Sequence, residues 1–228
     1  MTRRARYLVA AAGAAAMLVA AAPAEGRTDA RRLACYPSGS RTVTANEFVR
    51  VYTTPSHSPE SQHSRRFVAC SLERGLRRSL GGLDTGLFNT HLIANVRIAG
   101  RMVGYTRTAV GDSDQTDVIV RDATTGTALF SEPSTTGTQQ IQVVSDLEIT
   151  STGSAVWIAS YLTSDTQNRN YNGREVQAVE IGSGRHPVVR DSGLDIDAGL
   201  LALGRPNADG VSPIYWSKGG TVRSSTLR

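Results

Sequence analysis

The sequence repeats itself most clearly between residues 100–126, GRMVGYTRTAVGDSDQTDVIVRDATTG, and residues 153–184, GSAVWIASYLTSDTQNRNYNGREVQAVEIGSG. In each copy a glycine opens a turn and a Val-rich strand follows, after which a polar loop leads to another strand and another Gly turn. Short runs of Val, Ile, Tyr and Trp between Gly, Asp, Asn and Ser are typical of β-strands and tight turns. The two stretches therefore predict the same unit of antiparallel strands.

The two copies align at different offsets along their length. Over the first strand the offset is 53, which matches Val103 with Val156 and Tyr105 with Ile158. Over the later strand the offset is 58, because the second polar loop is longer. We therefore expect the loops between the strands, rather than the strands, to vary from copy to copy.

Weaker copies of the unit flank these two, over residues 49–75 and residues 201–227. The count is three complete units and a truncated one. A four-strand unit with a period of roughly 40–50 residues is typical of a propeller blade, whose faces are buried by neighbouring blades. We expect an all-β domain, a small four-bladed or incomplete β-propeller-like repeat, in which residues 42–44 supply the strand that closes the ring. A β-sandwich with repetitive hairpins is the alternative.

Residues 1–24 have the pattern of a secretory signal peptide. Three arginines precede the uncharged run Leu8–Ala22, and Ala22, Pro23 and Ala24 provide the small residues of a cleavage site. The run is short and Ala-rich for a bilayer core of roughly 30 Å, so we expect no transmembrane anchor. The prediction is cleavage after Ala24 and a secreted or extracytoplasmic protein of the cell envelope.

The mature chain divides into an N-terminal arm, residues 25–40, and a β-repeat domain, residues 41–228. The chain has two cysteines, Cys35 and Cys70, and both survive processing. Because an exported protein meets an oxidising compartment, we expect one disulfide between them that pins the arm to the first repeat. Two cysteines also exclude a disulfide-dense miniprotein and a four-cysteine zinc module.

The charge of the mature chain argues against nucleic acid as a partner. Removal of three arginines leaves 22 of the 25 basic residues against 20 acidic ones. All the basic residues except Lys218 are arginines, and they are scattered rather than gathered in a stripe with aromatic residues.

Several strand and turn segments resemble a family of exported proteins from high-GC bacteria with β-propeller-like repeats, to which no function is assigned. The resemblance covers nearly all of the mature chain and rests on the segments Asn46–Tyr52, Phe67–Leu72, Gly153–Ile158, Leu201–Leu203 and Ile214–Trp216. It implies the fold and the export of this chain. Because these are strand and turn positions, it assigns no catalytic residue.

Two Asp-Thr/Ser-Gly motifs, at Asp84 and at Asp191, give the strongest indication of catalysis. Aspartic proteases bring two such carboxylates together so that they share a proton and activate water. Here Arg190 interrupts the apolar strand that should precede the second motif, and Gly81-Gly82 weakens the first. Short Asp, Ser and Gly turns are common between strands. We therefore expect no catalytic residue, with the Asp84 and Asp191 pair as the alternative.

A second acidic group, Asp112, Asp114 and Asp117, falls in a polar loop between two predicted strands. Such loops can offer oxygen ligands to calcium, but this one lacks the Asp-x-Asp-x-Asp-Gly order and a late glutamate. We expect a solvated loop, with a calcium site as the alternative, and no cofactor.

These features favour a non-catalytic binding or cell-envelope protein whose ligand is a protein or carbohydrate of the envelope. The alternative is an exported hydrolase, either aspartic-protease-like or carbohydrate-active. The polar loops 53–65, 106–117 and 162–174 occupy the same position in each copy, so we expect them on one face of the domain. Recognition by such loops on a strand framework is one hypothesis, and plain solvated connections are the other.

Overall fold

The structure of this chain is a computed structural model, which describes residues 25–55, 65–82, 90–110, 115–135, 141–164 and 170–228. Within those ranges it is all-β apart from the helix α1 (Glu25–Ala34) and the single 3-10 turn η1 (Ile181–Ser183). The all-β prediction is therefore confirmed. No helix in the described ranges has the length and apolar character needed to cross a membrane.

The described strands form four antiparallel sheets, and each sheet is a meander of strands consecutive in sequence. The first sheet contains β1 (Arg41–Ala45), β2 (Val49–Pro55), β3 (Arg65–Ser71) and β4 (Arg77–Gly82). The second contains β5 (Thr90–Ala99), β6 (Met102–Val110), β7 (Gln115–Asp122) and β8 (Ala128–Pro133). The third contains β9 (Ile141–Ile149), β10 (Ala155–Ser164), β11 (Asn170–Val179) and β12 (Val188–Gly193). The fourth has β13 (Ile196–Leu203), β14 (Ser212–Lys218) and β15 (Thr221–Leu227). Three complete units and a truncated one are thus present, as expected.

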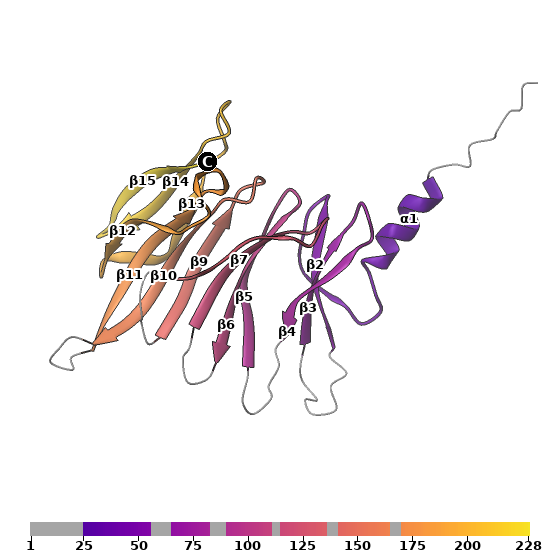
Figure 1. Cartoon of the computed structure of the whole chain (residues 1–228), viewed down its shortest axis with the longest axis horizontal. Coiled ribbons are helices and arrows are strands. Elements are labelled where there is room, and N and C mark those ends of the chain that lie inside the picture. The colour runs from indigo at the N-terminus through magenta and orange to yellow at the C-terminus, as the bar shows by residue number, and fades with distance from the viewer. Residues whose placement is uncertain (1–24, 56–64, 83–89, 111–114, 136–140, 165–169) are drawn as a thin grey trace, which may run out of the picture.

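The four sheets stand in a row, with α1 at one end and β15 at the other (Figure 1). Residues 42–44 lie in β1, which pairs with β2 at the edge of the first sheet. The prediction that they complete the last unit was therefore wrong. The physical reason is that a hairpin to the adjacent β2 needs only a short turn, whereas pairing with the last sheet would have to span the whole row.

Each space between neighbouring sheets holds its own apolar core. These cores are centred on Val51 and Tyr105 between the first two sheets, on Leu147 and Trp157 between the middle two, and on Ile158 between the last two. Every sheet therefore buries at least one face against a neighbour, as stacked repeats require.

One buried aromatic ring recurs in the second strand of each sheet, where it faces the preceding layer. The four rings belong to Tyr52, Tyr105, Trp157 and Trp216, and none is more than 5% exposed. Both indoles donate a hydrogen bond to the preceding sheet region, from Trp157 Nε1 to the Ser134 carbonyl and from Trp216 Nε1 to Asp191 Oδ2, each at 2.8 Å. Such rings fix the spacing of the layers because they fill space and satisfy a polar group together.

The aromatic positions correct the alignment of the two central copies by one residue. Val103 and Tyr105 face the first sheet, whereas Val156 and Ile158 face the fourth. Tyr105 therefore corresponds to Trp157, at an offset of 52 rather than 53. A shift of one residue moves a side chain to the opposite face of a strand, so the alignment of the first strand was wrong by one residue. The offset of 58 over the later strand agrees with the structure, because Tyr105 pairs with Ile119 and Trp157 with Gln177.

The N-terminal arm covers part of the outer face of the first sheet. It contains α1, whereas the sequence pattern gave no helix there, because the segment carries too few apolar residues to show a helical period. The expected disulfide joins Cys35 to Cys70, and both cysteines are fully buried with Tyr52, Val68 and Leu72. The arm thus occupies the position that a preceding sheet holds elsewhere in the row.

Candidate functional site

Asp191 lies in the strand β12 and not in a turn between repeats. Its carboxylate accepts hydrogen bonds from Lys218 Nζ at 2.7 Å and from Trp216 Nε1 at 2.8 Å. Burial alone would raise the pKa of Asp191, but the hydrogen bonds from Lys218, Trp216 and the Ser192 backbone outweigh it, so the pKa lies below its ordinary value. A carboxylate held ionised in this way ties the third sheet to the fourth. Asp84 lies outside the described residues.

Asp117 belongs to the strand β7, where the sequence pattern predicted a loop. Its Oδ2 accepts a hydrogen bond from Arg107 Nη2 at 2.9 Å, and Oδ1 accepts one from Gln115 Nε2 at 3.2 Å. A cross-strand ion pair therefore occupies this carboxylate. Asp112 and Asp114 lie outside the described residues, and the described part of the chain has no group of three or more His, Cys, Asp or Glu arranged to hold a metal.

The strand ends that flank the three predicted recognition loops lie along one side of the row, the lower side in Figure 1. The structure describes these connections only in part, because β2 runs to Pro55, β6 to Val110 and β10 to Ser164. Segments 56–64, 111–114 and 165–169 lie outside the described residues. Part of each predicted loop is thus strand, because cross-strand pairs such as Leu162 with Asn172 continue the ladder beyond the apolar residues.

A pocket of about 310 Å³ opens on the outer face of the first sheet, the face turned away from the second sheet. We call it the first-sheet pocket, and its lining residues are Pro37, Tyr52, Thr54, Arg66, Val68, Arg77 and Ser79. Strand pairing places these side chains together, because Tyr52 pairs with Val68, and Val68 pairs with Ser79 on its other side. Three adjacent strands therefore build the floor, and Pro37 of the arm adds a wall.

The pocket is positively charged. Arg66 and Arg77 line it, and neither they nor the adjacent Arg50 form an ion pair with a carboxylate of the described residues. Arg66 and Arg77 are exposed, while Arg50 is only 3% exposed. No acidic residue is among the lining residues, so the local charge favours an anion.

Arg50 is a fixed part of this positive region. Its guanidinium donates hydrogen bonds to the Cys35 carbonyl, to Ser40 Oγ at 3.2 Å and to Thr42 Oγ1 at 2.9 Å. It also lies over the rings of Tyr36 and Tyr52, 4.3 and 4.7 Å from their centroids. These contacts hold the arm on the sheet, and they leave the positive charge without a neutralising carboxylate among the described residues.

The pocket exists because the arm is smaller than a sheet. In the other three sheets the recurring aromatic ring packs against a whole preceding sheet, whereas Tyr52 meets the disulfide and a short segment around Pro37. The face beyond the arm is left open beside Thr54, Arg66 and Ser79. The sequence reasoning missed this site. The repeated aromatic spacing could have shown that the first unit lacks a preceding sheet.

The side chains of the first-sheet pocket can hold an anionic group. Its guanidiniums can hold a carboxylate or similar oxyanion through paired N–H donors, and the hydroxyls of Thr54 and Ser79 can donate to or accept from sugar or peptide groups. Among the lining residues, Tyr52, Thr54 and Ser79 carry hydroxyl groups, and none is a Cys, a His or a carboxylate.

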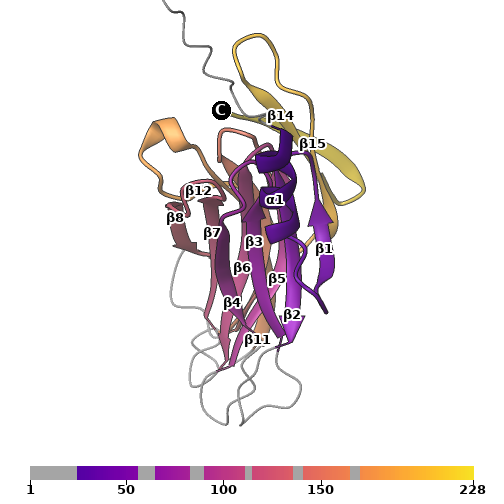
Figure 2. The same cartoon turned by 90° about the vertical axis from the view of Figure 1, so that its right-hand side faces the viewer.

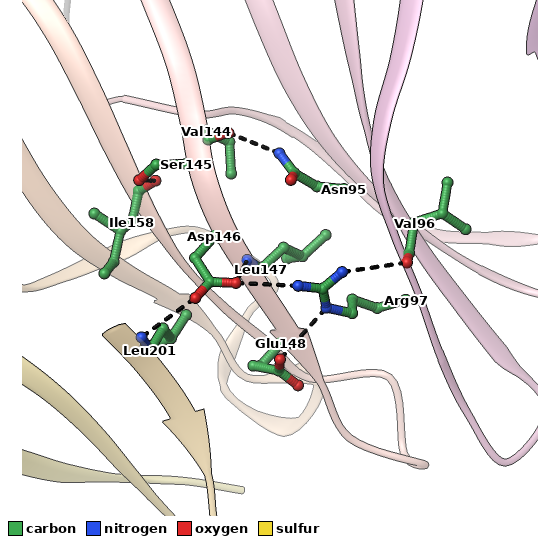
Figure 3. Close-up of polar contacts among 10 residues, drawn as sticks. All are labelled: Asn95, Val96, Arg97, Val144, Ser145, Asp146, Leu147, Glu148, Ile158 and Leu201. Atoms are coloured by element: carbon green, nitrogen blue, oxygen red, sulfur yellow. Dashed lines mark hydrogen bonds and ion pairs between the residues drawn. The ribbon is translucent and has the colours of Figure 1, made fainter. Parts of the chain in front are cut away.

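A second polar group, the inter-sheet cluster, consists of Asn95 and Arg97 on β5 with Asp146 and Glu148 on β9 (Figure 3). Arg97 contacts Asp146 Oδ1 at 3.2 Å and Glu148 Oε1 at 3.4 Å. Asp146 Oδ2 also accepts a hydrogen bond from the Leu201 amide of β13 at 3.3 Å. Burial raises the pKa of Glu148, against the opposing effect of Arg97. Every charged group of the cluster has a partner. Because these partners lie on β5, β9 and β13, the cluster joins the second, third and fourth sheets.

Comparison with known proteins adds no family to this picture. No protein-family model and no curated protein matches the chain. The function proposed below therefore rests on the site itself.

Proposed function

We propose that this chain is an exported, non-catalytic binding protein of the cell envelope, built as an open, propeller-like row of four sheets. Its ligand carries a carboxylate, as acidic glycans and peptidoglycan fragments do, and binds in the first-sheet pocket. The disulfide between Cys35 and Cys70 suits an extracytoplasmic compartment.

One observation carries the proposal. Arg66 and Arg77 flank a pocket with a buried Tyr52 floor, and no described carboxylate neutralises them. A surface arginine without a partner is common, but two beside a hollow of ligand size, together with two hydroxyl side chains, form a site for an anionic group.

The test is calorimetric titration of the purified protein with muropeptides that carry free carboxylates and with uncharged chito-oligosaccharides. We expect binding of the carboxylated ligand alone. Arg66→Ala and Arg77→Ala should each weaken it by roughly tenfold to a hundredfold, since a hydrogen bond to a charged group contributes about 1.5–3 kcal/mol. Arg205→Ala is the matched control, because Arg205 is an exposed arginine of the fourth sheet region.

Shortening the connection at 165–169, which belongs to the third sheet, separates this proposal from recognition by the loops. We expect that deletion to leave binding unchanged. If it abolishes binding while Arg66→Ala does not, the ligand meets the loops and not the first-sheet pocket.

A further inference from the structure

The outer edge of β15 differs from every other sheet edge in the described part of the chain. Seven of the eight strand pairs that include an edge strand contain a bulge or a shift in register. The eighth, β14 with β15, pairs without interruption from Ser212 with Leu227 to Lys218 with Thr221. Bulges are a common protection of sheet edges against pairing with another chain, and β15 has none.

The regular register of β15 is that of an inner strand. Among the described strands, the other uninterrupted pairs are those of the second and third strands in the first three sheets. In those sheets the third strand is covered by a fourth. β15 is the third strand of its own sheet, and no described strand pairs with its outer edge. It therefore has the geometry of an inner strand at an edge position.

The hairpin turn shows which amides of β15 point to that edge. Gly219 and Gly220 have φ of 58° and 73°, as a two-residue type I′ turn requires. The closing pair of such a turn exchanges both hydrogen bonds, and pairs then alternate along the hairpin. Val222, Ser224 and Thr226 therefore direct their N–H and C=O groups away from β14. Pro213, which has no N–H, lies opposite Thr226, and this pair makes no hydrogen bond between β14 and β15.

The side chains around this edge are also suited to a contact. Val222 is 71% exposed, Tyr215 40% and Leu200 58%. Strand pairing sets Tyr215 opposite Ser224 on the outer face, while Arg223, the single charged residue of β15, lies opposite Trp216 on the other face. The outer face of this strand is thus free of charge.

We propose that β15 pairs antiparallel with β15 of a second copy of this chain, about a two-fold axis at Ser224, to give one six-stranded sheet. This register sets Val222 opposite Thr226 of the partner subunit and Arg223 opposite Ser225 of the partner subunit, so no like charges face each other. A two-fold contact uses the β15 edge of both copies, so the contact closes after two copies. α1 lies at the far end of the row, away from this edge (Figure 1).

Amide hydrogen exchange measured from micromolar to millimolar protein concentration tests the pairing directly. We expect the amides of Val222, Ser224 and Thr226 to exchange at least about tenfold more slowly in the concentrated sample. The amides of Arg223 and Ser225, which already bond to β14, should be protected in both. If none of the five amides exchanges more slowly in the concentrated sample than in the dilute one, the proposal is overturned.

A pair of variants adds an independent readout by sedimentation. Ser224→Pro removes one outward N–H without removing a bond to β14, and Ser224→Ala keeps that N–H and removes only the hydroxyl. We expect a dimer at high concentration for the natural chain and for Ser224→Ala, and a monomer for Ser224→Pro. Near-ultraviolet circular dichroism of the two buried tryptophans, Trp157 and Trp216, reports whether the Pro variant is folded. A natural chain that stays monomeric, or a folded Pro variant that dimerises, contradicts the pairing.

Discussion

A few single side chains in this protein link neighbouring sheets. Asp191 illustrates this, because one carboxylate on β12 binds both Trp216 and Lys218 on β14. The sequence motif around it resembles that of a protease carboxylate, but among the described residues this carboxylate meets an ammonium and an indole. Asp84, the other residue of the alternative catalytic pair, lies outside the described residues. A three-residue motif thus gave no information about the partners that decide its chemistry.

The depressed pKa of Asp191 predicts the pH range in which it stabilises the fold. Its stabilisation is fully present above the unfolded-state pKa of about 3.9 and is lost as pH falls through the lower folded-state pKa. We expect Asp191→Asn to lower the melting temperature most at neutral pH, and the difference from the natural chain to narrow below about pH 4. A difference that is constant from neutral pH into this acid range would show that the charge is not involved.

Asp146 of the inter-sheet cluster has three partners, namely Arg97 and the Leu147 and Leu201 amides. We expect Asp146→Ala to lower the free energy of unfolding by about 1–3 kcal/mol, because it leaves buried donors without an acceptor. Urea denaturation measures this change. Asp209→Ala, in an exposed turn, serves as the control and should change stability little. Equal effects of the two substitutions would contradict a tie between sheets.

At the scale of the element, strands and turns were predictable because their residues carry a local signal. Runs such as Ala155–Ile158 gave the middle strands, although each extends into polar residues that cross-strand pairing alone holds in the ladder. The register of the strands was harder to predict from the sequence. The turn between Ala99 and Met102 has two residues, whereas the one between Ile149 and Ala155 has five, so aligning their glycines shifted the strands by one position.

The first-sheet pocket could not be predicted from local pattern. It depends on which face of the first sheet lacks a neighbour, and that is a property of the whole row. Cys35 and Cys70 were predictable because they are the chain's two thiols, and their pairing placed the arm near the sheet, but the size of the arm relative to the face was not encoded in any motif.

The disulfide is the element that fixes the arm to the first sheet. The bond joins residues 35 positions apart, so replacing both cysteines by serine should lower the free energy of unfolding by about 4 kcal/mol. We also expect weaker ligand binding, since Pro37 of the pocket wall follows Cys35 closely. Chemical denaturation and calorimetry of the double variant check both effects. Unchanged binding by the folded double variant would show that the arm does not shape the pocket.

At the scale of the whole molecule, the row has two different ends (Figure 1), and Figure 2 looks along the row from the end where α1 lies. The first sheet is partly covered by the arm, which leaves a positively charged pocket, and the last sheet presents the regular open edge of β15. The three cores between the sheets hold the row together, so both ends are free to make contacts without changing the interior. We therefore expect the proposed ligand binding and the proposed self-association to be removable separately.

The central claim is that an anionic ligand binds at the first-sheet pocket, and a nuclear magnetic resonance titration tests it most directly. Carboxylated muropeptides are added to the ¹⁵N-labelled protein, with uncharged chito-oligosaccharides as the control. We expect saturable shifts of the Tyr52, Thr54, Arg66 and Ser79 amides with the carboxylated ligand alone, and their loss in Arg66→Ala. Shifts confined to other sheets, or equal shifts with the uncharged sugar, would contradict the claim.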